Sequence, residues 1–281
     1  MCTSIEELLV EGRTRLAAVG FDLSLREANL FLAHVLGWSE AELLARTDRR
    51  PVSAEIEHYR QMLGRRLIGE PVAYILGEKE FYGRVLKVDD RVLIPRPETE
   101  HLVEHILKLE LPNPPTILDI GTGSGCLAVT LALELPQARV IATDISVAAL
   151  TVASDNFRRH GIESSVSAVA TDLAGSVDLS RIDLVVSNPP YVALEAVSEL
   201  SPEIVEHEPG QALFAGAKGD IVIRRLLDEL SELRAGAWLV IEIGYDQREL
   251  ILSLASSSRY RTVAVEPDYS GKPRIALLQL A

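Results

Sequence analysis

Cysteine is scarce in this chain, and so are long apolar runs. Cys2 and Cys126 are the only cysteines among 281 residues, so a disulfide framework is excluded and the usage fits a reducing compartment. No stretch approaches the length of a membrane span. Glu6 and Glu7 stand where a signal peptide carries basic residues ahead of an apolar run. We therefore expect a cytoplasmic protein with no membrane association.

A surplus of positive charge is also absent. The chain carries 28 Lys and Arg against 41 Asp and Glu, a formal net charge of −13. A nucleic-acid backbone repels such a protein unless a local basic face compensates. Most of the acidic excess lies beyond residue 80, so this larger part of the chain is the poorer candidate for binding DNA. We expect no direct nucleic-acid partner, and a monomer.

The first seventy residues carry the pattern of short helices. Ser4, Ser24 and Ser39 are each followed three residues later by a glutamate and then by apolar residues at helical spacing. This is the signature of a capping box at a helix start. We expect a small helical bundle over residues 1–79.

Residues 80–96 differ in character from the bundle. Apolar residues alternate there around the turn-forming pair Asp89-Asp90, which predicts a hairpin or an extended connector.

Residues 97–281 alternate between strand-like and helical patterns. The strand-like runs are Ile117–Ile120, Val140–Thr143, Val166–Val169, Ile182–Ser187, Trp238–Ile243, Thr262–Val265 and Ile275–Leu278. Strands that alternate with helices predict a parallel sheet covered on both faces. The last two runs are too close for a crossover helix, so they should pair as an antiparallel hairpin. The expected fold is therefore α/β and Rossmann-like, with seven strands.

A glycine-rich turn follows the first of these runs. It reads Asp119-Ile120-Gly121-Thr122-Gly123-Ser124-Gly125, and glycines allow a sharp turn and a close approach of the backbone to a ligand. A turn of this kind can also serve strand–helix packing alone. The nicotinamide pattern fails because Cys126 occupies the place of its third glycine. Asp119 suits a cationic amino-acid tail better than a pyrophosphate, which favours S-adenosylmethionine as the cofactor.

Asp144 ends the second strand-like run. A carboxylate at this place can accept hydrogen bonds from both ribose hydroxyls of a nucleoside, and its alternative role is to cap the helix that begins near Ser146. Because the glycine turn precedes it by one strand–helix unit, nucleoside binding is the favoured interpretation.

The tetrapeptide Asn188-Pro189-Pro190-Tyr191 follows the fourth run and indicates the reaction. An amide nitrogen is a poor nucleophile because its lone pair is delocalised into the carbonyl. The Asn188 side-chain oxygen and a backbone carbonyl at Pro189 can accept its two N–H bonds and so orient the lone pair. The prolines restrict the backbone, and Tyr191 offers a face for a planar group. We therefore predict methylation of a planar amide or amino nitrogen.

These motifs resemble the HemK/PrmC family of glutamine methyltransferases, whose members modify the glutamine of the Gly-Gly-Gln motif in peptide chain release factors. The resemblance covers almost the whole chain. Its further stretches are Gly69–Gly77, Glu80–Gly83, Leu93–Glu100, Asp172-Leu173 and Glu208–Leu213.

The resemblance implies the substrate, the cofactor and several site residues. It assigns cofactor binding by S-adenosylmethionine to Asp119, Gly121, Thr122, Gly123, Ser124, Gly125, Asp144, Asp172, Leu173 and Asn188. Substrate binding falls to Arg96 and Glu208 together with Asn188, Pro189, Pro190 and Tyr191, which form the catalytic clamp. The implied partner is a peptide chain release factor, which the helical region 1–79 would help to recognise.

Other readings stay open at this point. A ribosomal-protein glutamine methyltransferase is a near alternative. An adenine N(6)-methyltransferase of DNA uses a similar clamp on an extruded base, but the acidic balance counts against it. A non-catalytic interaction module is disfavoured by the intact motifs.

Several further residue patterns predict no chemistry of their own. His101 and His105 have the spacing of a metal pair without a third ligand, so a solvated helix face and no metal are expected. A packing role is expected for Cys126. Six arginines mixed with acids predict an ordinary surface or a partner-binding face: Arg46, Arg49, Arg50, Arg60, Arg65 and Arg66.

Overall fold

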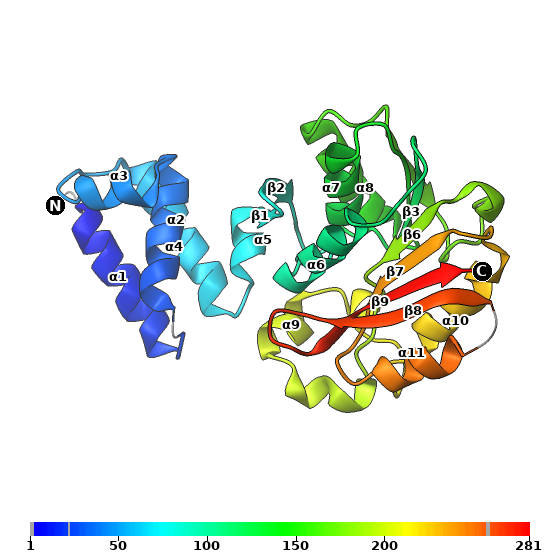
Figure 1. The fold of residues 1–281 in the computed structure, drawn as a ribbon. Coiled ribbons are helices and arrows are strands. Elements are labelled where there is room, and N and C mark those ends of the chain that lie inside the picture. The colour runs from blue at the N-terminus through cyan, green and yellow to red at the C-terminus, as the bar shows by residue number, and fades with distance from the viewer. Residues whose placement is uncertain (1–2, 22, 257–258) are drawn as a thin grey trace. The chain divides into compact units, whose positions relative to one another are not determined.

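A computed structural model describes residues 3–21, 23–256 and 259–281. The chain divides into two compact units (Figure 1). The first covers the described residues up to Gly77 together with Pro202–His207, and the second covers Glu78–Ser201 and Glu208–Ala281. Throughout the described part of the chain, every helix is too short or too polar to cross a membrane.

The first unit is helical. Its helices are α1 (Ile5–Ala18), α2 (Ser24–Leu36), α3 (Glu40–Ala45), α4 (Ser53–Leu67), α5 (Val72–Leu76) and α9 (Pro202–His207). The capping boxes at Ser4 and Ser39 are confirmed, because each serine side chain accepts from the N3 backbone and each N3 glutamate reaches back.

The capping box predicted at Ser24 is wrong. Helix α2 begins at Ser24 itself, and Leu23 stands at the N-cap without a side-chain hydrogen bond. Glu27, which would have completed the box, is buried and accepts two hydrogen bonds from Arg66 instead, at 2.9 and 3.0 Å. A carboxylate engaged with a buried guanidinium is not free to reach the helix start.

A buried tyrosine organises the core of the helical unit. The hydroxyl of Tyr59 on α4 donates to the carbonyl of Leu8 on α1 at 3.2 Å. A Cβ built on Gly12 of α1 would lie 2.0 Å from that hydroxyl, so only glycine lets the two helices approach here. Phe31 and Leu63 complete the same fully buried cluster. The apolar positions expected from helical spacing therefore do face one core.

The second unit begins with an antiparallel hairpin. Strands β1 (Glu78–Phe81) and β2 (Arg84–Lys87) pair through the tight turn Tyr82-Gly83, where both residues have positive φ angles of 50° and 74°. The turn expected at Asp89-Asp90 is therefore not the hairpin turn. Asp89 instead accepts from the backbone and side chain of Arg91. Two residues of left-handed backbone suit the right-handed twist of a hairpin, which explains the earlier turn.

A seven-stranded sheet forms the body of the second unit. Its strands are β3 (Thr116–Ile120), β4 (Arg139–Asp144), β5 (Val166–Ala170), β6 (Leu184–Ser187), β7 (Trp238–Glu242), β8 (Tyr260–Pro267) and β9 (Pro273–Leu280). They lie in the order β5-β4-β3-β6-β7-β9-β8. The first five of these run parallel, whereas β9 pairs antiparallel with both β7 and β8. The expected mostly parallel sheet with a terminal antiparallel hairpin is confirmed.

Helices cover both faces of this sheet (Figure 1). One face carries α6 (Pro97–Ile106), α7 (Cys126–Glu134) and α8 (Val147–Arg159), and the other carries α10 (Ile221–Glu229) and α11 (Arg248–Leu254). Short 3-10 turns complete the unit at Leu179–Arg181, Leu194–Glu199, Gly210–Ala212 and Leu230–Glu232. Alternate residues of each strand pack into the two apolar cores, because successive side chains of a strand point to opposite faces of the sheet.

The arginines of the helical unit are mostly engaged with carboxylates. Arg49 pairs with Glu55, Arg60 with Glu11, Arg65 with Glu70, and Arg66 with Glu27 and Glu203. Arg46 and Arg49 also lie over the ring of Trp38, at 4.9 and 4.6 Å from its centre. The expectation of an ordinary surface is wrong for Arg66, which is 5% exposed.

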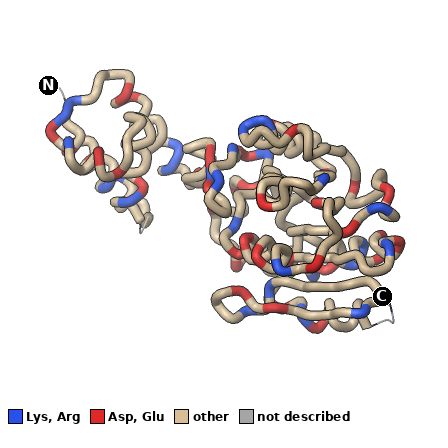
Figure 2. The backbone as a smooth tube through the Cα atoms, turned by 45° about the horizontal axis from the view of Figure 1, so that its top comes forward, with Lys and Arg blue, Asp and Glu red and all other residues tan. Residues whose placement is uncertain are grey.

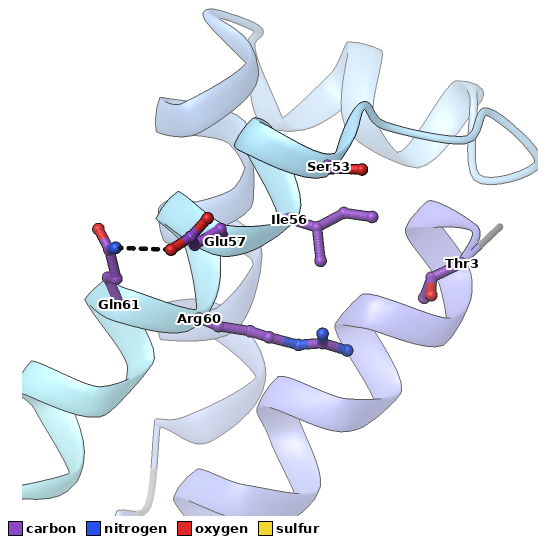
Figure 3. Close-up of a pocket in the computed structure, with 6 residues that line it drawn as sticks. All are labelled: Thr3, Ser53, Ile56, Glu57, Arg60 and Gln61. Carbon is purple, nitrogen blue, oxygen red and sulfur yellow. Dashed lines mark hydrogen bonds between the residues drawn. The ribbon is translucent and has the colours of Figure 1, made fainter.

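The helical unit also has a shallow surface depression of about 450 Å³ (Figure 3). It is lined by Thr3, Ser53, Ile56, Glu57, Arg60 and Gln61. Gln61 donates to Glu57 at 3.5 Å, and Arg60 is held by Glu11. These contacts engage the side chains of Gln61, Glu57 and Arg60 with one another or with Glu11.

Candidate active site

A cavity of about 310 Å³ lies in the second unit, at the carboxyl ends of strands β3, β4 and β6. Open α/β sheets bind ligands at this edge. Ten of the residues expected from the sequence line it: Arg96, Gly121, Thr122, Gly123, Ser124, Asp144, Asp172, Leu173, Asn188 and Pro190. Five others do not: Asp119, Gly125, Pro189, Tyr191 and Glu208.

The glycine turn is tied to the next strand through its backbone. The N–H groups of Gly121 and Thr122 both donate to the carbonyl of Thr143, each at 2.9 Å. Gly121 and Gly123 have φ angles of 72° and 55°, and a Cβ built on either would meet no atom within 4 Å. The glycines are therefore required by the backbone conformation, and they leave open space on the cavity side.

Gly125 has a different reason to be glycine. It is the N-cap of helix α7 with a φ angle of 82°, and a Cβ there would lie 2.8 Å from the ring of Phe157 on α8. The close approach of α7 and α8 needs this residue, so Gly125 serves packing rather than the cavity wall.

Asp144 holds two backbone segments at once. Its Oδ2 accepts from the N–H of Gly123 at 2.9 Å, and its Oδ1 accepts from the N–H of Ser146 at 2.8 Å. Ser146 itself caps helix α8 by accepting from Ala149. The carboxylate therefore fixes the glycine turn while it lines the cavity, and its capping role is only indirect.

Asp119 lies beneath the glycine turn and is 1% exposed. Its Oδ2 accepts from the Thr122 hydroxyl at 2.6 Å and from the Ala128 N–H at 3.1 Å, whereas Oδ1 has no partner among the described residues. Burial raises the pKa of Asp119 to about 7. The Ser124 hydroxyl is buried beside the cavity and also lacks a partner among the described residues. Two unpaired buried oxygens at one turn are groups that a bound polar ligand would satisfy.

The Asp172-Leu173 pair forms another part of the wall. Leu173 has a φ angle of 48°, which is rare for a residue other than glycine, and its carbonyl accepts from the Thr143 hydroxyl at 3.1 Å. Strained backbone of this kind is concentrated at functional sites. Asp172 is exposed and forms an ion pair with Arg225, which also lines the cavity, at 2.8 Å.

The clamp residues point in two directions. Asn188 and Pro190 line the cavity, whereas Pro189 is buried. The hydroxyl of Tyr191 donates to Oε1 of Glu242 at 3.0 Å, and burial raises the pKa of Tyr191. The ring of Tyr191 is thus held at its hydroxyl end by Glu242, and Tyr191 is not among the residues that line the cavity.

Two residues beyond the predicted set complete this arrangement. Thr99 on α6 and Glu242 at the end of β7 are each 1% exposed. Asn188 Nδ2 donates to the Thr99 hydroxyl at 3.1 Å, and that hydroxyl donates to Glu242 Oε2 at 2.6 Å. Burial raises the pKa of Glu242. The signal in the sequence is a carboxylate inside the apolar run Trp238–Ile243, because a buried charge usually has a function or a partner.

Arg96 and Glu208, both expected at the substrate site, form an ion pair. Arg96 Nη2 donates to Glu208 Oε1 at 2.5 Å, and the backbone of Ile94 donates to the other oxygen at 3.1 Å. The Glu208 side chain is 1% exposed, so its role within the described residues is to hold Arg96 at the cavity wall.

The histidine pair does not lie on a solvated helix face. His101 is buried, and its ring stands edge-on to Tyr269 with 3.7 Å between ring centres. Burial lowers the pKa of His105. The described residues contain no group of three or more potential metal ligands. Cys126 reaches the cavity wall and packs against the core, and burial raises its pKa to about 12, so the thiol stays protonated. Cys2 lies outside the described residues.

Two protein families match this sequence. The PrmC N-terminal domain matches residues 7–77, and the methyltransferase small domain matches residues 97–236. Solved structures with a similar fold include the hMettl16 catalytic domain in complex with MAT2A 3′UTR hairpin 1. Its TM-score is 0.56 at 17% identity over 83% of each chain. Another is a methyltransferase from Pyrococcus furiosus, with a TM-score of 0.51 at 20% identity over 79% of this chain and 97% of that one. At these identities they show the fold alone.

Relatives of higher identity extend over most of the chain. The release factor glutamine methyltransferase of Koribacter versatilis is 39% identical over 254 residues, 89% of each chain. That of Moorella thermoacetica is 39% identical over 277 residues, 98% of each chain. The bifunctional methyltransferase of Rickettsia conorii is 32% identical over 99% of this chain, which spans 58% of its length. The chain therefore belongs to the PrmC family of release factor glutamine methyltransferases and is an S-adenosylmethionine-dependent methyltransferase.

Proposed function

We propose that this protein methylates the side-chain amide nitrogen of the glutamine in a Gly-Gly-Gln motif of a peptide chain release factor. The names of the relatives from Koribacter versatilis and Moorella thermoacetica support this substrate. Within the chain, the observation that carries the proposal is the orientation of Asn188. Its Nδ2 is committed to Thr99, so its Oδ1 is left as a hydrogen-bond acceptor at the cavity wall.

The residues at the cavity suit S-adenosylmethionine. The unpaired oxygens of Asp119 and Ser124 are acceptors for an ammonium group, and Asp144 is an acceptor for ribose hydroxyls. The open space beside Gly121 and Gly123 allows a ligand to lie against the backbone. When bound, the cofactor supplies an electrophilic methyl group on a sulfonium. Among this chain's residues, Asp119, Ser124, Asp144 and Leu173 would hold it.

The acceptor requires an oriented lone pair rather than a strong base. Asn188 Oδ1 would accept one N–H of the substrate amide, and a backbone carbonyl in the Asn188–Tyr191 segment would accept the other. Both contacts turn the nitrogen lone pair out of conjugation and toward the methyl group. The amide proton leaves to solvent after transfer. Preorganised acceptors of this kind stabilise the positive charge that develops on nitrogen in the transition state.

The amino group of adenine is the chemically closest alternative acceptor. Acidic and basic residues are interspersed along the chain of both units (Figure 2), and the net charge is −13. An acidic net charge disfavours binding to the phosphate backbone of a nucleic acid. The glutamine side chain of a protein is therefore the acceptor that the chain supports best.

Mass spectrometry after a methylation reaction tests the proposal. Wild-type protein and S-adenosylmethionine are incubated with a release factor, with the same factor carrying Gln→Glu in its Gly-Gly-Gln motif, with a ribosomal protein, or with duplex DNA. We expect a gain of one methyl group on the motif glutamine of the intact factor alone. Methylation of the ribosomal protein or the DNA, with none on the release factor, would contradict the proposal.

A further inference from the structure

Proton accounting around Thr99 fixes the direction of the Asn188 amide. A threonine hydroxyl has a single proton to donate, and an ionised carboxylate can only accept. The Thr99 proton goes to Oε2 of Glu242 at 2.6 Å, so toward Asn188 the same oxygen can only accept. With Glu242 ionised, Asn188 presents its Nδ2 to Thr99, which is the contact observed at 3.1 Å.

Sheet register brings these three residues together. Ser187 on β6 pairs with Ile241 on β7, so the residues that follow them, Asn188 and Glu242, emerge side by side from the same edge. Helix α6 packs against β7, and Thr99 on this helix lies beside both side chains. Thr99 and Glu242 are each 1% exposed, so water does not compete for their hydrogen bonds. The second Glu242 oxygen accepts from the hydroxyl of Tyr191, so one carboxylate also holds the end of the clamp.

We propose that Thr99 and Glu242 are positioning residues that lock Asn188 in the orientation its Oδ1 needs to accept from the substrate. The inference rests on the proposed function for its consequence in catalysis. The lock itself is a property of the three side chains and does not depend on the substrate's identity. Neither Thr99 nor Glu242 touches the reacting nitrogen in this account, because both act through Asn188.

Substitutions at Thr99 separate the lock from simple packing. Thr99→Val removes the hydroxyl at nearly constant volume, and Thr99→Ser retains it. Thr130→Val is the matched control, since Thr130 is fully buried on α7 and its hydroxyl has no partner among the described residues. Glu242→Gln keeps the shape but can present its oxygen to only one of the two hydroxyls. On a Gly-Gly-Gln peptide we expect kcat to fall about 10- to 100-fold in Thr99→Val and Glu242→Gln, with a smaller change in KM. Thr99→Ser and Thr130→Val should stay close to wild type.

A readout without turnover follows the amide itself. In the full-length 15N-labelled protein, the side-chain NH2 resonances of Asn188 are those lost in Asn188→Ala. They should shift in Thr99→Val and Glu242→Gln and keep their wild-type positions in Thr99→Ser and Thr130→Val. Affinity for S-adenosylhomocysteine, measured by calorimetry, should be unchanged in all four variants.

Two results would overturn the lock. One is an unmoved Asn188 amide signal in Thr99→Val. The other is an equal loss of kcat in Thr99→Val and Thr99→Ser, which would indicate packing instead. A wild-type protein that leaves the peptide unmodified would contradict the proposed function instead, and the amide resonances would still decide whether the lock exists.

Discussion

The carboxylate of Asp144 holds the backbone of Gly123, with 2.9 Å between Oδ2 and the amide nitrogen. Gly123 follows β3 and Asp144 is the last residue of β4, so one hydrogen bond joins the glycine turn to the end of the neighbouring strand. A carboxylate that is expected to accept from a ribose thus also shapes the turn that would accommodate the rest of the cofactor.

Asp144→Ala should weaken binding of S-adenosylhomocysteine while the protein stays folded. A charge-assisted hydrogen bond is worth about 1.5–3 kcal/mol, which corresponds to roughly 10- to 150-fold in Kd. Calorimetric titration measures the loss, and circular dichroism checks the fold. Asp144→Asn retains an acceptor for Gly123, so it should lose less. An affinity equal to wild type in the alanine variant would remove Asp144 from the site.

Asn188→Ala should nearly abolish methyl transfer and leave cofactor affinity within about threefold. The side chain acts mainly on the transition state, so its loss lowers turnover more than binding. Removal of a single preorganised group of this kind costs about 100- to 1,000-fold in kcat. Single-turnover assays on a Gly-Gly-Gln peptide, paired with calorimetry, separate the two effects. Retained turnover would show that another group orients the lone pair.

The raised pKa of Asp119 predicts that the free energy of unfolding depends on pH. Its folded-state pKa of about 7 lies above the ordinary value of 3.8, so the folded chain holds the proton more tightly than the unfolded chain. The resulting stabilisation is complete below pH 3.8 and is lost as the pH rises through about 7. Asp119→Asn stays neutral throughout and keeps an acceptor for Thr122 and Ala128. Its free energy of unfolding relative to wild type should therefore rise by up to about 4 kcal/mol between pH 4 and 8.

Urea unfolding at several pH values between 4 and 8 measures this difference for Asp119. The comparison of variant with wild type cancels the titration of all other groups. A difference that does not vary with pH would mean that Asp119 is already ionised in the folded protein at pH 4.

Asn156→Ala should destabilise the second unit. The Asn156 side chain is fully buried and makes three hydrogen bonds to backbone groups, two with Lys87 of β2 and one with the Ser124 carbonyl. Its loss leaves the buried Ser124 carbonyl unpaired, at about 1–3 kcal/mol before relaxation, and also the part-buried backbone groups of Lys87. Urea unfolding should show a loss of about 2–4 kcal/mol, given that relaxation recovers part. Thr130→Val serves as the buried polar control, and an equal loss in both variants would contradict the argument.

Removal of the residues that precede Glu78, which carry helices α1–α5, tests the expected role of this region in recognition. A truncated chain should begin at Glu78, because Phe81 and Leu86 of the β1–β2 hairpin belong to the core of the second unit. Specific protein interfaces bury roughly 1,200–2,000 Å², more than a single glutamine offers. We expect the truncated chain to bind S-adenosylhomocysteine as tightly as the full chain does. Its rate of methylation should fall strongly on a whole release factor and less on a short Gly-Gly-Gln peptide, each compared with the full chain. An equal deficit on peptide and protein would assign the helical unit a catalytic or stabilising role.

The linear sequence determined the fold class and the polar residues at the strand ends that line the cavity. Gly121, Asp144 and Asn188 each follow an apolar strand-like run, and parallel strands bring their carboxyl ends to one edge. These patterns are local, since a strand and the turn after it occupy fewer than ten residues. Local patterns also predicted the capping boxes at Ser4 and Ser39, which need only residues three apart.

Tertiary structure alone decided which polar groups meet across the chain. Glu27 cannot complete a capping box because Arg66, 39 residues away, takes its carboxylate. Asn188 faces Thr99 across 89 residues, and Thr99 reaches Glu242 across 143. No periodicity in the sequence encodes such contacts. They arise because helix α6 and strand β7 pack together, and burial then forces each polar group to find a partner.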